Sequence, residues 1–234
     1  MIAASILHQS RSLLMRRTVP NDASLLYEKA YSNREFMHLY RLNDAPSCEA
    51  EVYQRLVQRQ NDPNRHLNLQ LLVIHRKHGP IGIAGLAAIV PLHRRAEYVL
   101  GLFEDKYRSA GYGLEAGLML LDLAFNRYNL HKLSSVVYGY NQSAQKGTSS
   151  GGFSLVGIDR EHIFDLETQE FVDLYRYGMT ENDFRQNKRL IPLAKRFLNR
   201  DITQKQTSSM PVSKSPYMKS GTITLQAPAL NISR

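Results

Sequence analysis

The chain has 234 residues, of which 43% are hydrophobic, so it is long enough to bury a sizeable core and its composition excludes wholesale disorder. Its net charge of +9 comes from 30 basic and 21 acidic residues, and four of the cations follow Ile202 in a stretch without Asp or Glu. Because it has no block of five Lys or Arg and no Trp, the sequence does not favour nucleic-acid binding.

The sequence also gives no clear signal for a membrane-spanning helix, a signal peptide or a disulfide. No apolar run approaches the roughly 18 residues of a membrane-spanning helix, and the Ile2–Leu7 run lacks the preceding cations of a signal peptide. The single cysteine, Cys48, excludes an internal disulfide and a cysteine-cluster metal site, and we expect no bound metal. A reducing cytoplasm is the simplest compartment.

The first half of the chain is predicted to contain one strand, then two helices, then a hairpin. In chain order they are a strand over Ser12–Val19, a helix capped by Asp22 and running to Leu39, a helix opened by Pro46 and Ser47 with Val52, Leu56 and Val57 on one side, and strands over Leu67–Arg76 and Ile81–Val90.

The second half alternates strands and helices. The predicted elements are a strand over Glu97–Phe103, a polar glycine-containing loop, a helix over Gly113–Asn126 that buries Leu114, Leu118, Leu121 and Phe125, a strand over Leu133–Tyr140, a hairpin joining Ile163–Phe164 to Phe171–Tyr177, and an amphipathic helix over Asn187–Arg200. This order predicts a mixed α/β sheet with helices on both faces, in one domain over residues 10–201. The basic stretch 202–234 reads as a disordered tail with a short strand at Thr222–Leu225.

The loop after the Glu97–Phe103 strand carries the clearest chemical signal. Its sequence, Arg108-Ser109-Ala110-Gly111-Tyr112-Gly113, leads into a helix, whose first N–H groups bind anions because they lack intrahelical partners. A nucleotide P-loop would need Gly-Lys-Ser/Thr here, and a dinucleotide fold would need its glycines tight against the strand. The arrangement matches instead Arg/Gln-x-x-Gly-x-Gly/Ala, which holds the pyrophosphate of coenzyme A.

Further motifs place this loop in a wider pattern. They are His93-Arg94-Arg95-Ala96-Glu97 before the strand, Asn141 with Ala144, Gly152-Phe153, Glu161-His162-Ile163-Phe164 and Phe171-Val172-Asp173. As a set over residues 12–185, they resemble the GNAT superfamily of acyl-CoA-dependent N-acyltransferases, in its branch of ribosomal-protein and spermidine acetyltransferases. The resemblance implies a mostly antiparallel sheet whose fourth and fifth strands splay apart, an acetyl-CoA donor and an amine acceptor.

The resemblance also implies which residues contact the donor. Main-chain groups of Gly101, Leu102 and Phe103 would face the pantetheine arm, and Asn141 would contact it from the other strand. The phosphates would lie on Arg108, Ser109, Ala110, Gly111, Tyr112, Gly113 and Leu114. The N–H of Leu102 or a neighbour would stabilise the negative charge of the tetrahedral intermediate.

For catalysis, Glu97 is the candidate base for the amine, acting directly or through water, although it is equally a surface partner for Arg95. His93 and His162 are alternative bases. The family's usual tyrosine acid is replaced by Thr148, so Tyr140 is the proposed substitute, with Tyr138 nearby. Residues 146–152 form a poor helix sequence, which predicts a short or frayed helix there.

The sequence leaves three candidate functions. The first is an N-acetyltransferase whose acceptor amine attacks the thioester directly. The second is a non-catalytic acyl-CoA-binding or interaction protein, suggested by Thr148. The third is a serine hydrolase, because Gly147-Thr148-Ser149-Ser150-Gly151 matches G-x-S-x-G, although no apolar strand precedes it. The acceptor is expected to be a small-molecule amine or a protein N-terminus, shaped by residues 31–45 and the last hairpin. The oligomeric state is left open, with a homodimer as one option.

Overall fold

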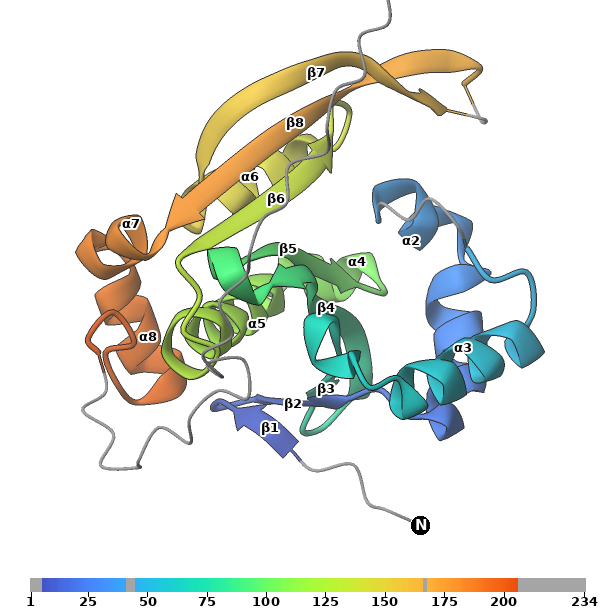
Figure 1. Cartoon of the computed structure of the whole chain (residues 1–234), viewed down its shortest axis with the longest axis horizontal. Coiled ribbons are helices and arrows are strands. Elements are labelled where there is room, and N and C mark those ends of the chain that lie inside the picture. Colours follow the sequence, from blue (N-terminus) through green and yellow to red (C-terminus); the bar gives the residue numbers. More distant parts are fainter. Residues whose placement is uncertain (1–5, 41–44, 166–167, 206–234) are drawn as a thin grey trace, which may run out of the picture.

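The computed structural model describes residues 6–40, 45–165 and 168–205 (Figure 1). The described strands are β1 (Ile6–Gln9), β2 (Leu13–Arg17), β3 (Leu69–His75), β4 (Gly79–Val90), β5 (Arg95–Leu102), β6 (Lys132–Tyr138), β7 (Ser154–Asp165) and β8 (Glu170–Thr180). The α-helices are α1 (Ala23–Leu26), α2 (Arg34–Leu39), α3 (Glu49–Asn61), α4 (Asp105–Ser109), α5 (Tyr112–Asp122), α6 (Gln142–Ser150), α7 (Glu181–Gln186) and α8 (Leu190–Leu198). Short 3-10 or π turns, η1 to η5, cover Pro20–Asp22, Tyr27–Tyr31, Arg65–Leu67, Pro91–His93 and Leu123–Arg127.

The strands form an eight-stranded sheet in the order β1-β2-β3-β4-β5-β6-β8-β7. Every neighbouring pair is antiparallel except β5 and β6, which run parallel. The predicted mixed α/β sheet with helices on its faces is therefore confirmed. The expected fourth and fifth strands correspond to β5 and β6, because an additional strand, β1, precedes the first one predicted.

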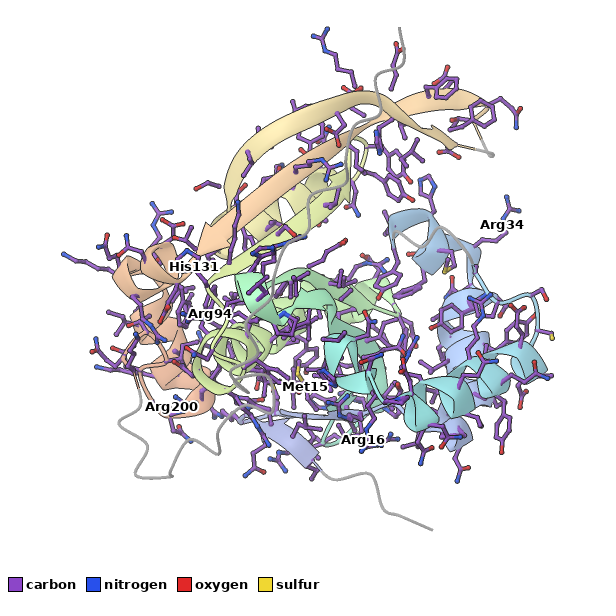
Figure 2. The ribbon with its side chains drawn as sticks, in the orientation of Figure 1. Met15, Arg16, Arg34, Arg94, His131 and Arg200 are labelled. Carbon is purple, nitrogen blue, oxygen red and sulfur yellow. The ribbon has the colours of Figure 1, made fainter. Side chains whose placement is uncertain are left out.

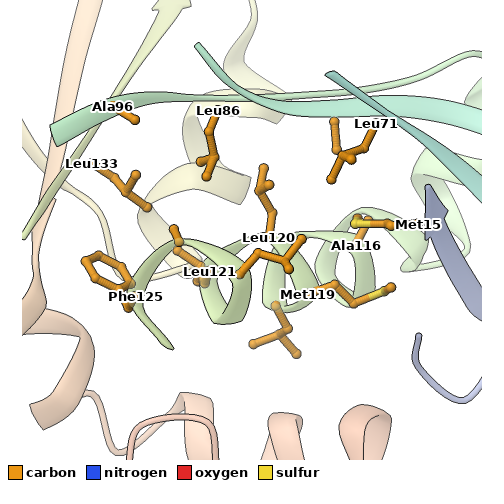
Figure 3. Packing of buried hydrophobic residues seen from close by; sticks show 14 of the residues in the cluster. Met15, Leu71, Leu86, Ala96, Ala116, Met119, Leu120, Leu121, Phe125 and Leu133 are labelled. Carbon is orange, nitrogen blue, oxygen red and sulfur yellow. The ribbon is translucent and has the colours of Figure 1, made fainter. Parts of the chain in front are cut away.

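The two faces of the sheet bury separate hydrophobic clusters. Alternate side chains of β3 divide between them: Leu71 and Val73 pack with α5 and α8, whereas Leu72 packs with α1, α2 and α3. Figure 3 shows the larger cluster, in which Leu120 and Met15 lie between α5 and the strands. The site described below depends on this division, because each face brings a different set of helices to the sheet.

The first turn of α5 is anchored by a buried carboxylate. Glu115 accepts hydrogen bonds from the Ser10 hydroxyl at 2.7 Å and from the Ser12 N–H at 2.9 Å, and also from the Ser12 hydroxyl. These bonds tie the start of α5 to the β1–β2 turn. A carboxylate in the first turn also interacts favourably with the helix dipole, so the N-terminus of α5 is held in a fixed position.

Several predicted elements differ in detail. The loop expected after β5 contains helix α4, helix α7 precedes the predicted last helix, and the final hairpin extends over the whole of β7 and β8. Leu118, Leu121 and Phe125 are buried as predicted, but the burial expected for Leu114 is wrong, since that side chain is 36% exposed. Leu114 lies in the first turn of α5, beyond the edge of the core.

The continuous helix predicted from Asp22 to Leu39 is also wrong. The chain forms α1, a π turn and then α2, which restarts where the Asn33 side chain accepts a hydrogen bond from the Phe36 N–H at 3.1 Å. Asp22 does not cap α1, because its carboxylate accepts from the Arg16 guanidinium and from the Val19 N–H. The break lets α2 lie at an angle that a single helix would not permit.

The helix expected to be short or frayed is α6, which is regular over nine residues. Its N-cap, Asn141, accepts a hydrogen bond from the Ala144 N–H at 3.0 Å. The Gln145 side chain donates to the carbonyls of Tyr138 and Gly139, and these bonds offset a glycine cost of about 1 kcal/mol at Gly147.

The folded part continues slightly past residue 201, where the domain was expected to end. Ile202 and Thr203 are buried, and the Ile202 carbonyl accepts a hydrogen bond from the Asn126 side chain at 2.8 Å. The predicted strand at Thr222–Leu225 lies outside the described residues.

Candidate active site

The parallel pair β5 and β6 separates after three residues. Arg95, Ala96 and Glu97 pair with residues 132–134, and beyond Glu97 the register of the pair ends although both strands continue. Figure 1 shows the two strands diverging, with α6 beside β6 and α4 beside the end of β5. Side chains from both strands, α2, α5 and α6 line a cavity of about 750 Å³ in this opening. The predicted splay is therefore present.

Main-chain groups of β5 face the opening at alternate residues. Phe103 donates its N–H to the Ile81 carbonyl of β4 at 2.9 Å, and Gly101 lies opposite Ile83 in the same register. Since antiparallel bonding alternates, the peptide groups of Leu100 and Leu102 are directed away from β4, toward the opening. Of the three residues predicted to offer main-chain groups, Leu102 has this orientation, whereas Gly101 and Phe103 face β4. The Phe103 side chain is buried among the α1–α3 residues.

The loop predicted to hold phosphates, called the phosphate loop below, is built from α4 and the start of α5. Gly111 is the N-cap of α5 and has a φ of +81°, which is favourable only for glycine. Of the predicted loop residues, Arg108, Gly111, Gly113 and Leu114 line the cavity. Ser109 instead donates its hydroxyl to the Asp105 carbonyl, and the Tyr112 ring packs 4.8 Å from the His75 ring, while Ala110 is exposed between the two helices. The loop thus presents two glycines, one guanidinium and a helix N-terminus to the cavity.

Helix α2 covers the opening and is attached on both sides of it. On one side the Arg108 guanidinium donates to the Glu35 carboxylate. On the other side the Tyr140 hydroxyl donates to the His38 carbonyl at 2.6 Å, and the Asn141 amide donates to the Leu39 carbonyl at 3.3 Å. Sequence reasoning did not find this role of α2, since it depended on the helix break at residues 32–33.

Close contact between α2 and β5 requires a glycine in the strand. A Cβ atom at Gly101 would lie 2.6 Å from the Tyr40 ring and 2.8 Å from the Phe36 ring. Phe36 and Tyr40 stack with their centroids 4.9 Å apart, and both line the cavity. The predicted site residue Gly101 therefore contributes by its missing side chain.

Glu35 binds Arg108, the cation that the sequence predicts for a phosphate, so it is expected to compete with the donor. Replacing Glu35 with Gln is expected to tighten coenzyme A binding about two- to fivefold, the effect of removing a solvent-exposed ion pair of about 0.5–1 kcal/mol. Titration calorimetry measures this, with Glu28→Gln as a matched surface control. Weaker binding in Glu35→Gln would contradict the competition.

Glu97 lies at the point where the two strands part. It is half-buried, lines the cavity, and is in register with Ala87 of β4 and Ser134 of β6. The alternative bases do not share this position: His93, at the end of the Pro91–His93 turn, and His162 on β7 are exposed and are absent from the cavity lining.

Tyr140 and Asn141 also line the cavity, at the end of β6. The Tyr140 ring stacks on the His38 ring at 4.4 Å and on the Tyr138 ring at 5.1 Å. Thr148 lines the cavity from α6, as expected from the position of the family's tyrosine. Ser149, by contrast, lies inside α6 rather than at a strand-to-helix turn, so the serine-hydrolase alternative loses its geometry.

Metal-ligating side chains do not cluster in residues 6–40, 45–165 and 168–205. In this part of the chain, no group of three or more His, Cys, Asp or Glu is placed to hold a metal ion. Nor does any helix within these ranges combine the length and apolar character needed to span a bilayer.

The splayed parallel pair with a helix N-terminus at its mouth is the arrangement that the sequence resemblance implied. Residues 12–154 match the family model described as "Acetyltransferase (GNAT) domain". The chain therefore belongs to the GNAT acetyltransferases and is an acetyl-transferring enzyme. Enzymes of this family take the acetyl group from acetyl-CoA.

Individual proteins show the same similarity. The uncharacterized N-acetyltransferase YoaA of Bacillus subtilis (strain 168) is 23% identical over 172 residues, covering 70% of this chain and 91% of YoaA. Among solved structures, a variant of the spermidine N-acetyltransferase SpeG of Vibrio cholerae superposes with a TM-score of 0.63 and 21% identity, covering 76% of this chain and 96% of SpeG. A dodecameric SpeG structure gives a TM-score of 0.65 at 19% identity, covering 76% of this chain and 98% of the other. These structures share the fold.

Proposed function

We propose that this enzyme transfers an acetyl group from acetyl-CoA to a primary amine, on a small molecule or a protein N-terminus, by direct attack on the thioester. The observation that carries the proposal is the opening between β5 and β6, which joins the α5 N-terminus on one face of the sheet to Glu97 on the other. The similarity to SpeG supports placing the chain in the branch of ribosomal-protein and spermidine acetyltransferases.

The residues present fit acetyl-CoA. Gly111, Gly113 and the first N–H groups of α5 would hold the pyrophosphate together with Arg108, and the pantetheine arm would bond to β5 as an added strand would. In this proposal the peptide groups of Leu100 and Leu102, which face the opening, would bond to that arm, and Asn141 would contact it with the amide N–H that does not donate to the Leu39 carbonyl. The N–H of Leu102 is the proposed donor to the tetrahedral oxyanion.

The amine must lose a proton before or during its attack. In this proposal, Glu97 accepts it through intervening water, because five residues of β5, about 16 Å at ~3.3 Å per residue, separate Glu97 from Leu102. Tyr140 protonates the departing thiolate. Because the Tyr140 hydroxyl donates to the His38 carbonyl, that hydrogen bond must break before the proton is given up. A coenzyme A thiolate is a good leaving group, so Tyr140 is expected to contribute less than Glu97. The cytoplasmic location and the homodimer stay predictions.

The role of Glu97 has a direct test. Glu97→Gln keeps the size of the side chain but removes the base, so kcat for amine acetylation is expected to fall about 100-fold, within the range for general-base catalysis. Release of free thiol from acetyl-CoA measures kcat, and calorimetry should show unchanged coenzyme A affinity. Glu170→Gln, at an exposed position on β8, is the matched control. An unchanged kcat in Glu97→Gln would remove Glu97 from the mechanism.

The same assay tests the function as a whole. Thiol release that depends on an added amine supports acetyl transfer. Tight coenzyme A binding without amine-dependent release would support instead the non-catalytic binding protein considered from the sequence.

A further inference from the structure

The glycine that joins α4 to α5 does not by itself fix the shape of the phosphate loop. Gly111 has a φ of +81°, but glycine adopts negative φ values about as readily as positive ones. It therefore permits the observed conformation without enforcing it. On the proposed function, the loop offers its N–H groups to a pyrophosphate only while α4 and α5 keep their relative position. Contacts from elsewhere in the chain must hold the two helices there.

Four aromatic rings connect these two helices to the turn between β3 and β4. On the turn, the His75 and His78 rings stack with their centroids 4.5 Å apart. From α5 the Tyr112 ring lies 4.8 Å from His75, and from α4 the Tyr107 ring lies 6.2 Å from His78. The two tyrosine rings are 6.4 Å apart, so each ring contacts two others. We call these four residues the ring cluster. One tyrosine precedes Gly111 and the other follows it, so the cluster spans the loop.

His75 is the anchored member of the ring cluster. It ends β3 and is only 6% exposed. Its Nδ1 accepts hydrogen bonds from the N–H of Lys77 at 3.1 Å and from the N–H of His78 at 3.2 Å, so this nitrogen carries no proton. Burial and the neighbouring His78 lower the pKa of His75, so the ring stays neutral at physiological pH and keeps both bonds. The ring is therefore held in one orientation against Tyr112.

A second anchor holds α5 from a different side. The Glu115 carboxylate accepts hydrogen bonds from the Ser10 hydroxyl and the Ser12 N–H, which ties α5 to the β1–β2 turn. The ring cluster differs from this anchor because it includes a residue of α4 as well as one of α5. It is therefore placed to hold the two helices relative to each other, across Gly111.

We infer that His75 and Tyr112 are positioning residues for donor binding, because their ring contact keeps the phosphate loop in the arrangement that accepts the pyrophosphate. The inference rests on the proposed function and extends it to residues that do not line the cavity. Without the ring contact, the loop spends part of its time in other arrangements. The apparent affinity for the donor then falls in proportion to the fraction of molecules that remain competent to bind.

Titration calorimetry with coenzyme A on the full chain tests this role. His75→Asn removes the ring but keeps an acceptor for the two N–H groups of the turn, and Tyr112→Leu removes the ring on the other side. Each is expected to weaken binding about tenfold, the upper range for one aromatic pair. Tyr112→Phe keeps the ring and should retain the parent affinity. Parent affinity in either ring-deleted variant, or an equal loss in Tyr112→Phe, overturns the inference.

The double variant distinguishes one shared contact from two separate effects. If both residues act through their ring contact, His75→Asn combined with Tyr112→Leu should lose about tenfold and not about 100-fold in affinity. A loss near 100-fold would overturn the shared contact. Tyr53→Leu on α3 and His131→Asn before β6, both at exposed positions, are the matched controls and should retain the parent affinity.

A ligand without phosphates separates positioning of the loop from general damage to the fold. Pantetheine lacks the pyrophosphate, and its weak binding is measured by ligand-observed NMR. Its affinity is expected to be the same in the parent and in every variant. An equal loss for pantetheine and coenzyme A overturns the inference, since the defect then lies outside the phosphate loop. Failure of the parent to bind coenzyme A is a separate result, because it overturns the proposed function before any variant is compared.

Discussion

Replacement of Gly113 by glutamate is expected to weaken coenzyme A binding at least 100-fold while the protein remains folded. Gly113 lies in the first turn of α5 and lines the cavity. A Cβ atom there would meet only a Leu102 methyl group, at 3.7 Å, which is an ordinary contact. The carboxylate would occupy the position expected for the pyrophosphate, where like charges repel at short range and the helix N–H groups would bind the side chain instead.

The fold should tolerate this change, which makes the result interpretable. An acidic residue in the first turn of a helix is favourable, so the melting temperature of Gly113→Glu is expected to remain within a few degrees of the parent. Gly113→Gln provides the matched control, with equal bulk and no charge, and should lose much less affinity. Titration calorimetry with coenzyme A gives both values. An affinity close to the parent in Gly113→Glu would show that the phosphates do not bind at this loop.

The second large effect is expected at Asp122, a buried carboxylate of α5 that joins the two ends of the described chain. It accepts hydrogen bonds from the His8 Nε2 at 2.5 Å and from the Asn126 amide at 2.7 Å, and it also pairs with Arg200. Arg200, labelled in Figure 2, follows α8, whereas His8 lies on β1. One carboxylate therefore connects β1, α5 and the segment after α8.

Asp122→Asn is expected to lower the free energy of unfolding by about 3 kcal/mol, because it leaves the Arg200 guanidinium beside a neutral group in a largely buried position. For a domain of this size, the melting temperature should fall by about 6–12 °C. Chemical denaturation followed by circular dichroism measures the difference. Glu49→Gln, at an exposed position on α3, should change stability by less than about 0.5 kcal/mol. A similar small effect in Asp122→Asn would show that this cluster adds little stability.

The contribution of Asp122 also depends on pH in a defined direction. Burial alone would raise the pKa of its carboxyl, but the hydrogen bonds from His8 and Asn126 and the charge of Arg200 outweigh burial, so the pKa is lowered. A lowered pKa stabilises the fold at every pH above the unfolded value of about 3.9, and the stabilisation is lost as pH falls through the folded pKa. The stability difference between the parent and Asp122→Asn should therefore shrink as the pH falls below about 4.

Much of the fold was predictable because its signals are local. The helical period of Leu118, Leu121 and Phe125 identified α5, and the alternating or continuous apolar runs identified β3, β4 and β6. The glycines at 111 and 113 marked the phosphate loop, since only glycine adopts the backbone at Gly111 easily. In each case, the residues that carry the signal lie within a few positions of the structure they specify.

The resemblance implied that β5 and β6 splay, but the residue at which they part required the tertiary structure. The point at which two parallel strands part is set by their pairing partners, β4 and β8, and not by either strand alone. Sequence reasoning therefore named Gly101, Leu102 and Phe103 together, although bonding to β4 leaves only Leu102 of these directed toward the opening. The position of Glu97, at the point where the two strands part, depends on the same strand pairing.

From its sequence alone, this protein could be recognised as a mixed α/β chain with a helix N-terminus suited to a pyrophosphate, because periodicity and glycine placement act over short distances. Only the tertiary structure decided that α2 leaves the line of α1 and lies over the opening. The contacts that hold it there, from Glu35 to Arg108 and from Tyr140 to His38, join residues 73 and 102 positions apart. Contacts at such separations depend on the whole packed sheet, and no local pattern of residues encodes them.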